Sequence, residues 1–175
     1  GECKGLLKTA IRDNDPVMFF EHKMLYTTKF NDVPEVEEDV CIPFGRARIV
    51  AEGADITVVT NSMMTIKAEK AVRQLQKEGI SAELIDLRTI VPLDTETIIR
   101  SVKKTGKLLI VDEGHLSFGI TGEIASRIMP DVFYDLDAPI QRMGTADVPL
   151  PFSPALEFPL IPDEKKIAAK IREMV

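Results

Sequence analysis

Polar side chains that could do chemistry stand directly after the predicted strands of this sequence. They include arginine, glutamate, histidine and aspartate, which can clamp an anion, hold a metal or transfer a proton. Open α/β sheets bind their ligands beyond the carboxyl ends of the strands, so these positions are the first place to look for a site. The four groups are Asn61-Ser62, Arg88-Thr89, Glu113-Gly114-His115 and Gly144-Thr145-Ala146-Asp147.

None of these groups forms a complete catalytic set by sequence. His115 could act in acid-base work, but no Ser or Cys is placed by sequence as its nucleophile. Asp112, Glu113 and His115 are neighbours on one strand end and cannot easily converge on one metal ion. The glycine-rich stretch 114–122 lacks the G-x-G-x-x-G spacing of a dinucleotide turn and the lysine of a phosphate loop. The residues therefore predict no self-contained active site.

Two further charged positions could fix a contact between domains, and one of them, Arg88, also has a ligand-binding interpretation. Arg88 follows an apolar strand, where it could clamp a carboxylate or phosphate group of a ligand, or form an ion pair between domains. Glu21-His22 closes an apolar run near the start of the chain, and such a polar pair at a strand end often fixes a contact between domains.

Strands and helices alternate regularly from about Gly45 onward, which predicts a mostly parallel sheet with helices on both faces. Arg46–Val50 and Ile56–Thr60, joined by a turn at Glu52–Asp55, predict a hairpin that adds an antiparallel edge. The further predicted strands are Ala82–Leu87, Leu108–Val111 and Pro139–Met143. The predicted helices begin at Ser62, Asp94, Gly122 and Asp163, and the third ends at Pro130. The fold class is α/β with three layers.

The composition excludes several classes of protein. The chain has 22 Lys and Arg against 28 Asp and Glu, a net charge of -6, so general nucleic-acid binding is not expected. No apolar run approaches the roughly 20 residues that span a bilayer, so we expect no membrane partner. Cys3 and Cys41 are too few for a disulfide framework. These features indicate a cytoplasmic or organelle-matrix protein.

The first 45 residues differ from the rest. Residues 4–12 show helical spacing of apolar side chains, and Val17–Phe20 is an apolar run typical of a buried strand. One helix and one strand cannot cover each other, so they need a sheet from elsewhere. Residues 31–43 are acidic and bounded by proline, which predicts a linker.

The blocks of sequence resemble a known family in their order and spacing. They are residues 4–26 (KGLLKTAIRDNDPVMFFEHKMLY), IPFG at 42–45, ITVVT at 56–60, AELIDLRTIVPL at 82–93, ADVP at 146–149 and IPD at 161–163. Together they resemble the β subunit of the decarboxylating component of 2-oxoacid dehydrogenase complexes, with the pyruvate enzyme the best match. The acetoin and branched-chain enzymes are near relatives.

That resemblance implies a fold, a cofactor and partners. Residues 1–30 would be the end of a pyrimidine-binding domain, 31–45 a linker and 46–175 a transketolase C-terminal-type domain. The assembled enzyme would bind thiamine diphosphate with magnesium and pass an acyl group to lipoamide. Its partners would be the α subunit, a second β subunit and the lipoyl acyltransferase component. The family's cofactor-activating glutamate and active-site histidine are expected upstream of Gly1, so no residue here inherits a catalytic or cofactor-binding role.

The resemblance also implies one ion site. In relatives a potassium ion is held largely by main-chain oxygens of a loop that matches residues 10–15, so Ala10, Ile11, Asp13 and Asp15 occupy the ligand positions. The alternative is an ordinary helix end followed by a turn rich in Asx residues. For the whole chain, the alternative to an enzyme part is an assembly or docking module with no catalytic role.

Overall fold

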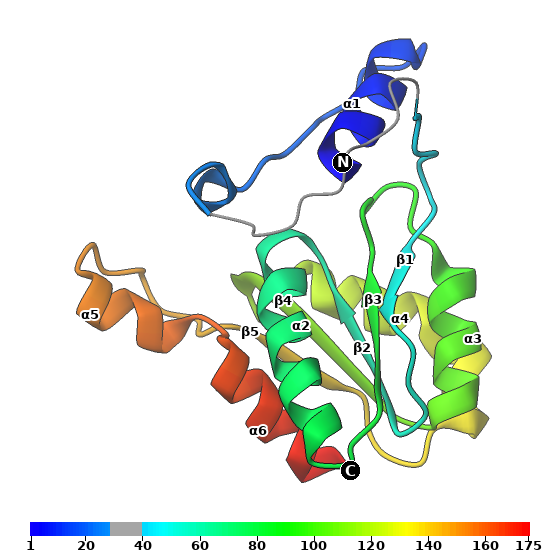
Figure 1. Ribbon diagram of the computed structural model, residues 1–175, viewed down its shortest axis with the longest axis vertical. Helices are drawn as coiled ribbons and strands as arrows, with labels where there is room; N and C mark the ends of the chain where they lie inside the picture. The colour runs from blue at the N-terminus through cyan, green and yellow to red at the C-terminus, as the bar shows by residue number, and fades with distance from the viewer. Residues whose placement is uncertain (29–39) are drawn as a thin grey trace.

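A five-stranded mixed sheet forms the centre of the molecule in the computed structural model, which describes residues 1–28 and 40–175 (Figure 1). The strands lie in the order β1-β3-β2-β4-β5, and all neighbours from β3 to β5 are parallel. The strands are β1 (Arg48–Ala51), β2 (Ile56–Thr60), β3 (Ala82–Asp86), β4 (Leu108–His115) and β5 (Gln141–Thr145). The predicted three-layer α/β fold is confirmed.

Helices cover both faces of this sheet, because the inner strands are apolar on both sides. One core is built from α2, α6 and alternate residues of the strands, and a second core lies under α3 and α4. Every residue of β2 and β3 is buried, as is the run Leu108–Val111 of β4. The helices are α2 (Ser62–Lys77), α3 (Thr95–Thr105), α4 (Ile120–Val132) and α6 (Glu164–Met174), with a short 3-10 turn η2 (Phe133–Asp135) after α4.

The predicted hairpin is wrong. β1 pairs antiparallel with β3, not with β2, and β2 lies between β3 and β4. The turn decides this pairing, because the main-chain N–H groups of Ala54 and Asp55 both donate to the carbonyl of Ser81. Gly53 lies so close to the backbone of residues 82–83 that a Cβ would clash at 2.2 Å. The turn is therefore fixed against the start of β3, and the antiparallel edge strand forms there.

Two of the described α-helices begin at the predicted side-chain caps. Asp94 and Asp163 cap α3 and α6 as predicted, each accepting from an N–H three residues later. Asn61, not Ser62, is the N-cap of α2. The predicted end at Pro130 of the helix that begins at Gly122 is wrong, because this helix, α4, continues to Val132. A proline is tolerated there since the carbonyl four residues earlier, at Ser126, lies on the exposed side of the helix and can bond to water.

The N-terminal segment contains α1 (Glu2–Arg12) and the 3-10 helix η1 (Lys23–Tyr26). The predicted strand at Val17–Phe20 is wrong: this stretch is extended but unpaired, and Met18 and Phe20 are 79% and 86% exposed. In the described parts of the chain the five strands pair only among themselves, and none of them pairs with this stretch. The predicted linker falls mostly on residues 29–39, outside the described residues. The division into 1–30, 31–45 and 46–175 stays a prediction.

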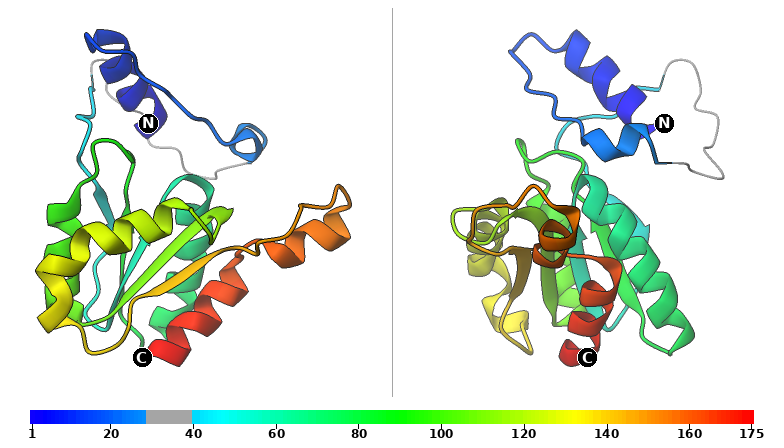
Figure 2. Two further views of the ribbon diagram at one scale, coloured as in Figure 1. Left: turned by 180° about the vertical axis from the view of Figure 1, so that it is seen from behind. Right: turned by 90° about the vertical axis from the view of Figure 1, so that its left-hand side faces the viewer.

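Two further segments leave the compact part of the molecule. Between β5 and α6 the chain runs outward through α5 (Pro154–Glu157) and the 3-10 turn η3 (Phe158–Leu160), away from the sheet (Figure 2). The N-terminal segment lies over the end of the sheet opposite the C terminus (Figure 1). Among the described helices, none combines the length and the apolar character that crossing a membrane requires.

Candidate functional site

The carboxyl ends of the parallel strands meet at one edge of the sheet, and the N-terminal segment covers this edge (Figure 1). The strand-end residues predicted from the sequence are therefore brought together. Backbone strain gathers there as well: Ser62, Arg88 and Phe118 have φ values of 47°, 58° and 57°, in the left-handed region that non-glycine residues rarely adopt. They follow β2, β3 and β4 in turn. Such residues cluster at functional sites.

Arg88 forms an ion pair with the chain's own N-terminal helix. Its guanidinium contacts the carboxylate of Glu2 through two nitrogens, one of them Nε at 3.0 Å. Arg48, at the start of β1, donates to the same Glu2 oxygen at 3.0 Å. Burial by itself raises the pKa of the Glu2 carboxyl, but the two guanidinium groups outweigh it and hold that pKa below its usual value. Of the two interpretations of Arg88, the structure shows the ion pair.

Asp86 lies beneath this pair as a buried carboxyl group at the end of β3. Its Oδ1 accepts the main-chain N–H of Arg88 at 3.2 Å. Burial raises the pKa of Asp86, and the nearby charge of Glu2 adds to the rise. The carboxyl edge therefore holds two carboxyl groups whose pKa values move in opposite directions.

A second contact joins the N-terminal segment to β4. His22 Nε2 lies 2.6 Å from Glu113 Oε2, and both side chains are about three-quarters buried. The predicted role of Glu21-His22 in a contact between segments is confirmed for His22. The neighbouring Glu21 accepts a hydrogen bond from the hydroxyl of Tyr26.

The three neighbours on the end of β4 point to different partners. Asp112 accepts the N–H of Gly114 at 2.9 Å, Glu113 faces His22, and the Nδ1 of His115 is 2.9 Å from the carbonyl of Ala146. They do not converge on one point. Within residues 1–28 and 40–175, no group of three His, Cys, Asp or Glu side chains could hold a metal ion.

His115, Ser117 and Asp147 line a shallow surface depression together with Val148 and Pro149. Ser117 donates its hydroxyl to Asp147 at 2.6 Å and its main-chain N–H to the other carboxylate oxygen at 3.2 Å. These bonds hold the pKa of Asp147 below its usual value. Because the serine is bound to the carboxylate and not to the histidine, the trio lacks the nucleophile–base contact of a hydrolase.

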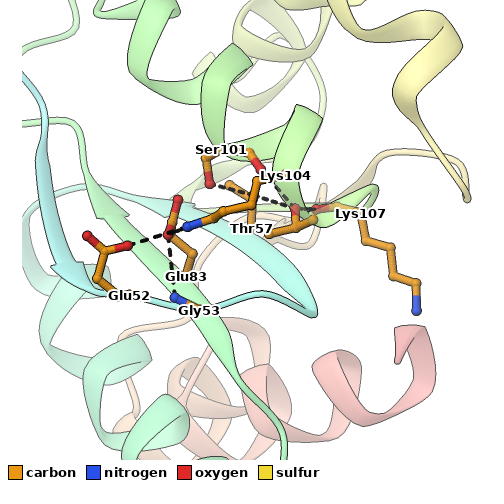
Figure 3. A network of polar contacts seen from close by, with 8 residues as sticks. Glu52, Gly53, Thr57, Glu83, Ser101, Lys104 and Lys107 are labelled. Carbon is orange, nitrogen blue, oxygen red and sulfur yellow. Dashed lines mark hydrogen bonds and ion pairs between the residues drawn. The ribbon is translucent and has the colours of Figure 1, made fainter.

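The amino end of β3 carries a separate polar network (Figure 3). Glu83 has a side chain only 2% exposed and is paired with the ammonium group of Lys104, which also lies 3.4 Å from Glu52. The N–H of Gly53 donates to the same Glu83 carboxylate at 3.4 Å. Burial raises the pKa of Glu83, but the hydrogen bond from Lys104 and the smaller contacts outweigh it and leave that pKa lowered. This network is internal to the domain.

The residues of the predicted potassium loop lie at the end of α1. Ala10 and Ile11 belong to its last turn, and Asp13 is its C-cap. The N–H of Asp13 points to the Ala10 carbonyl at 3.4 Å, and the N–H of Asp15 donates to Asp13 Oδ1 at 2.9 Å. This is the Asx-rich turn of the alternative interpretation, and the ion site stays a prediction.

Sequence reasoning missed Glu2, Arg48, Glu83 and Lys104. Glu83 could have been found, because a carboxylate inside an otherwise buried strand needs a cationic partner. Glu2 gives no comparable signal, since its partner Arg88 is 86 residues away in sequence.

Comparison with known proteins supports the fold and the resemblance. Residues 45–167 match the family described as "Transketolase, C-terminal domain". The chain is 48% identical over 171 residues to "Pyruvate dehydrogenase E1 component subunit beta" of Rickettsia felis, covering 98% of this chain and 52% of that protein. It is 43% identical over 174 residues to "2-oxoisovalerate dehydrogenase subunit beta" of Bacillus subtilis, covering 99% of this chain and 53% of that protein.

A solved structure, "Split gene transketolase, inactive beta4 tetramer", superposes with a TM-score of 0.66 at 27% identity. It covers 81% of this chain and 45% of that one. The chain thus spans about half the length of the relatives that it matches, and it corresponds to their C-terminal part. The resemblance drawn from the sequence blocks is confirmed, and the chain belongs to the transketolase C-terminal domain family.

Proposed function

We propose that this chain is the C-terminal part of the β subunit of a thiamine diphosphate-dependent 2-oxoacid dehydrogenase of the pyruvate type. The observation that carries the proposal is the 48% identity to a pyruvate dehydrogenase β subunit over 98% of the chain. In the assembled enzyme it supports oxidative decarboxylation and transfer of the acyl group to lipoamide, in the bacterial cytoplasm or the mitochondrial matrix.

The described residues do not fit a thiamine diphosphate site. They offer no acidic cluster for the magnesium ion that accompanies the diphosphate. At the edge where α/β folds bind ligands, the guanidinium groups of Arg48 and Arg88 are already paired with Glu2. In this proposal other parts of the enzyme hold the cofactor, which supplies the electron sink for decarboxylation.

The role of this chain is then assembly. Its α/β domain fixes the N-terminal segment through the Glu2–Arg88 and His22–Glu113 contacts. The proposed partners are an α subunit, a second β subunit and the lipoyl acyltransferase component.

The proposal includes potassium at the end of α1, held by main-chain oxygens of Ala10, Ile11, Asp13 and Asp15. The last carbonyls of a helix have no intrahelical donors, so they are suitable ligands for a large monovalent cation. Thermal unfolding in potassium against tetramethylammonium chloride tests this: a higher midpoint in potassium is expected, and equal midpoints contradict it.

A branched-chain substrate is the second candidate, because the 2-oxoisovalerate relative is nearly as similar, at 43% identity. An acetoin enzyme and a non-catalytic docking module are the remaining alternatives. Turnover measurements decide between these substrates.

The test is to express the β subunit that carries this sequence with its α subunit. Release of CO2 from pyruvate and from 2-oxoisovalerate is then measured with and without thiamine diphosphate. Cofactor-dependent release that is faster from pyruvate is expected. A stable α–β complex that releases no CO2 from either substrate would contradict the proposal and favour a docking module.

A further inference from the structure

The start of helix α4 contains a buried hydroxyl group that has no hydrogen-bond partner. Thr121 is only 2% exposed, and nothing in the described parts of the chain forms a hydrogen bond with its Oγ1. Burying a hydroxyl without a partner is unfavourable, so such a group in a folded domain needs an explanation. A ligand that accepts a hydrogen bond from this hydroxyl would provide one.

The hydroxyl of Thr121 points toward the N-terminal end of α4. Thr121 is the second residue of this helix, after the N-cap Gly119 and the first residue Ile120. Side chains of a helix tilt toward its N-terminus, so the side chain of the second residue lies beside the helix end. Gly119 offers no side-chain cap, and within residues 1–28 and 40–175 the main-chain N–H groups of Ile120 and Thr121 have no acceptor. One hydroxyl and two N–H donors therefore lie together at this helix end.

A guanidinium group adds positive charge to these donors. Arg142 of β5 lies against the third residue of α4, since a Cβ added to Gly122 would be 3.1 Å from Arg142 Nη1. The same nitrogen donates to the carbonyl of Leu116 at 3.2 Å, which holds the arginine beside the helix end. Arg142 is exposed, and no carboxylate of the described residues forms an ion pair with it. An arginine at the positive end of a helix dipole favours a bound anion.

The carboxylates on the elements around this helix end have other partners. Glu123, in the first turn of α4, is paired with Arg127 at 2.6 Å. Asp147 accepts two hydrogen bonds from Ser117, and Asp112 accepts a main-chain N–H at 2.9 Å. Since no cluster of metal-binding side chains occurs in the described part of the chain, an anion bound here would be held without a metal ion.

These donors match a single phosphate group. A phosphate carries up to two negative charges and three terminal oxygens, which can accept from helix N–H groups, a hydroxyl and a guanidinium at once. A carboxylate has one charge and two oxygens, so it would use these donors less fully. Residues 114–122 lack the G-x-G-x-x-G spacing of a dinucleotide turn, so one phosphate rather than a dinucleotide is the expected ligand group.

We propose that the N-terminus of α4, with the hydroxyl of Thr121 and the guanidinium of Arg142, binds the phosphate group of a small molecule without a metal ion. This site does not depend on the proposed function. Free phosphate and a nucleoside monophosphate share the required chemistry. Phe118 is fully exposed one residue before the N-cap, where the base of a nucleotide can stack on it.

The test is a titration of the 175-residue chain with inorganic phosphate at pH 7, followed by amide NMR spectra. Sodium chloride of equal ionic strength is the reference. Saturable shifts of the amide signals of Ile120, Thr121 and Gly122 are expected with phosphate only. Shifts that do not saturate, or equal shifts with chloride, would overturn the proposal.

Two substitutions test the side-chain donors. Arg142→Met and Thr121→Val are each expected to weaken phosphate binding by about 10-fold, because each removes a hydrogen bond to a charged group. Arg73→Met is the matched control: it removes the same charge from α2, which covers the opposite face of the sheet from α4 (Figure 1). The control is expected to leave the affinity unchanged. An equal loss in the control, or unchanged affinity in both site variants, would contradict the proposed site.

Thermal unfolding separates ligand binding from a structural role of Thr121. Because the hydroxyl has no partner within the described chain, Thr121→Val should leave the unfolding midpoint unchanged or raise it. A lowered midpoint without any loss of phosphate affinity would show that the hydroxyl serves the fold and would overturn its assignment to the site.

Adenosine monophosphate identifies the source of the phosphate group. If it binds more tightly than inorganic phosphate, and Phe118→Ala removes the difference, the ligand is a nucleotide. If both probes bind equally and Phe118→Ala has no effect, the phosphate group alone is recognised. Either result supports the site, whereas binding of neither probe would overturn it.

Discussion

The two ends of strand β3 both carry charged groups, but the partners of these groups come from different parts of the chain. At the amino end, Glu83 is paired with Lys104 of α3 and with the turn at Gly53, all within the α/β domain. At the carboxyl end, Arg88 is paired with Glu2 of the N-terminal segment.

The charged pair at the amino end of β3 contributes to the stability of the α/β domain, whereas the pair at the carboxyl end attaches the N-terminal segment to that domain. The Glu83 side chain is almost fully buried, so its partner is part of what lets the domain fold. The Glu2 carboxylate is one-third exposed and could be solvated if α1 moved away. We therefore expect changes at the amino end to alter the free energy of unfolding, and changes at the carboxyl end to alter the attachment of the N-terminal segment.

A substitution in the apolar core of the sheet gives the loss of unfolding free energy with which the two charged ends are compared. Leu109 is fully buried in the inner strand β4. Leu109→Ala is expected to lower the free energy of unfolding by about 2–5 kcal/mol, because it removes apolar contacts and leaves a cavity. Urea denaturation measures this loss. A loss below about 1 kcal/mol would mean that β4 is not part of a close-packed core.

Removing the ammonium group of Lys104 at the amino end of β3 is expected to lower the free energy of unfolding by nearly as much. Lys104→Met leaves the Glu83 carboxylate buried without its charge partner, and we expect a loss of about 3 kcal/mol. Lys103→Met is the control. Lys103 lies 4.0 Å from Asp135 in an exposed ion pair, which is expected to contribute little to the free energy of unfolding. Equal effects of the two substitutions in urea denaturation would show that the Glu83 pair does not contribute to stability.

The layers of the fold were predictable from the sequence, because each strand and helix is determined by residues close together in the chain. Apolar runs such as Leu108–Val111 and the caps Asp94 and Asp163 determine strands and helices within a few residues. The pairing of β1 with β3 depends instead on where the turn at Gly53 is fixed, which is a contact between distant residues. Val17–Phe20 has the composition of a strand, but none of the five strands pairs with it in the described structure.

The candidate site was predictable on one side of the Glu2–Arg88 contact, and on both sides of the His22–Glu113 contact, although the sequence did not pair these two residues with each other. Strand-end position singled out Arg88 and Glu113 as candidate site residues. Their partners Glu2 and His22 are 86 and 91 residues away in sequence, and the path of the N-terminal segment decides whether they meet.

At the carboxyl end, Arg88→Met is expected to lower the free energy of unfolding of the α/β domain by about 1 kcal/mol or less, because the pair is partly exposed. Its main effect is expected on α1, whose amide hydrogens should exchange faster because Glu2 retains only Arg48. Hydrogen exchange measures this directly. Arg73→Met, which breaks an exposed pair with Glu69 inside α2, is the control and should leave exchange in α1 unchanged. Unchanged exchange in both variants would show that Arg88 does not hold the N-terminal segment.

The smallest expected effect is on the pH dependence of stability, because the fold raises the pKa of Asp86 and lowers that of Glu2. Because the folded protein raises the pKa of Asp86 above 3.8, ionisation of this group disfavours the fold, and its contribution to stability is lost as pH rises through the raised pKa. Asp86→Asn keeps an acceptor for the N–H of Arg88, so it should raise stability at pH 7 by less than the losses above, with no gain at pH 3. Because the fold lowers the pKa of Glu2 below 4.5, Glu2→Gln should reduce stability at pH 7, and the reduction should fade as pH falls through that lowered value. Urea denaturation at pH 3, 5 and 7 measures both, and a pH-independent effect of either substitution would contradict the opposed charges at the carboxyl end of β3.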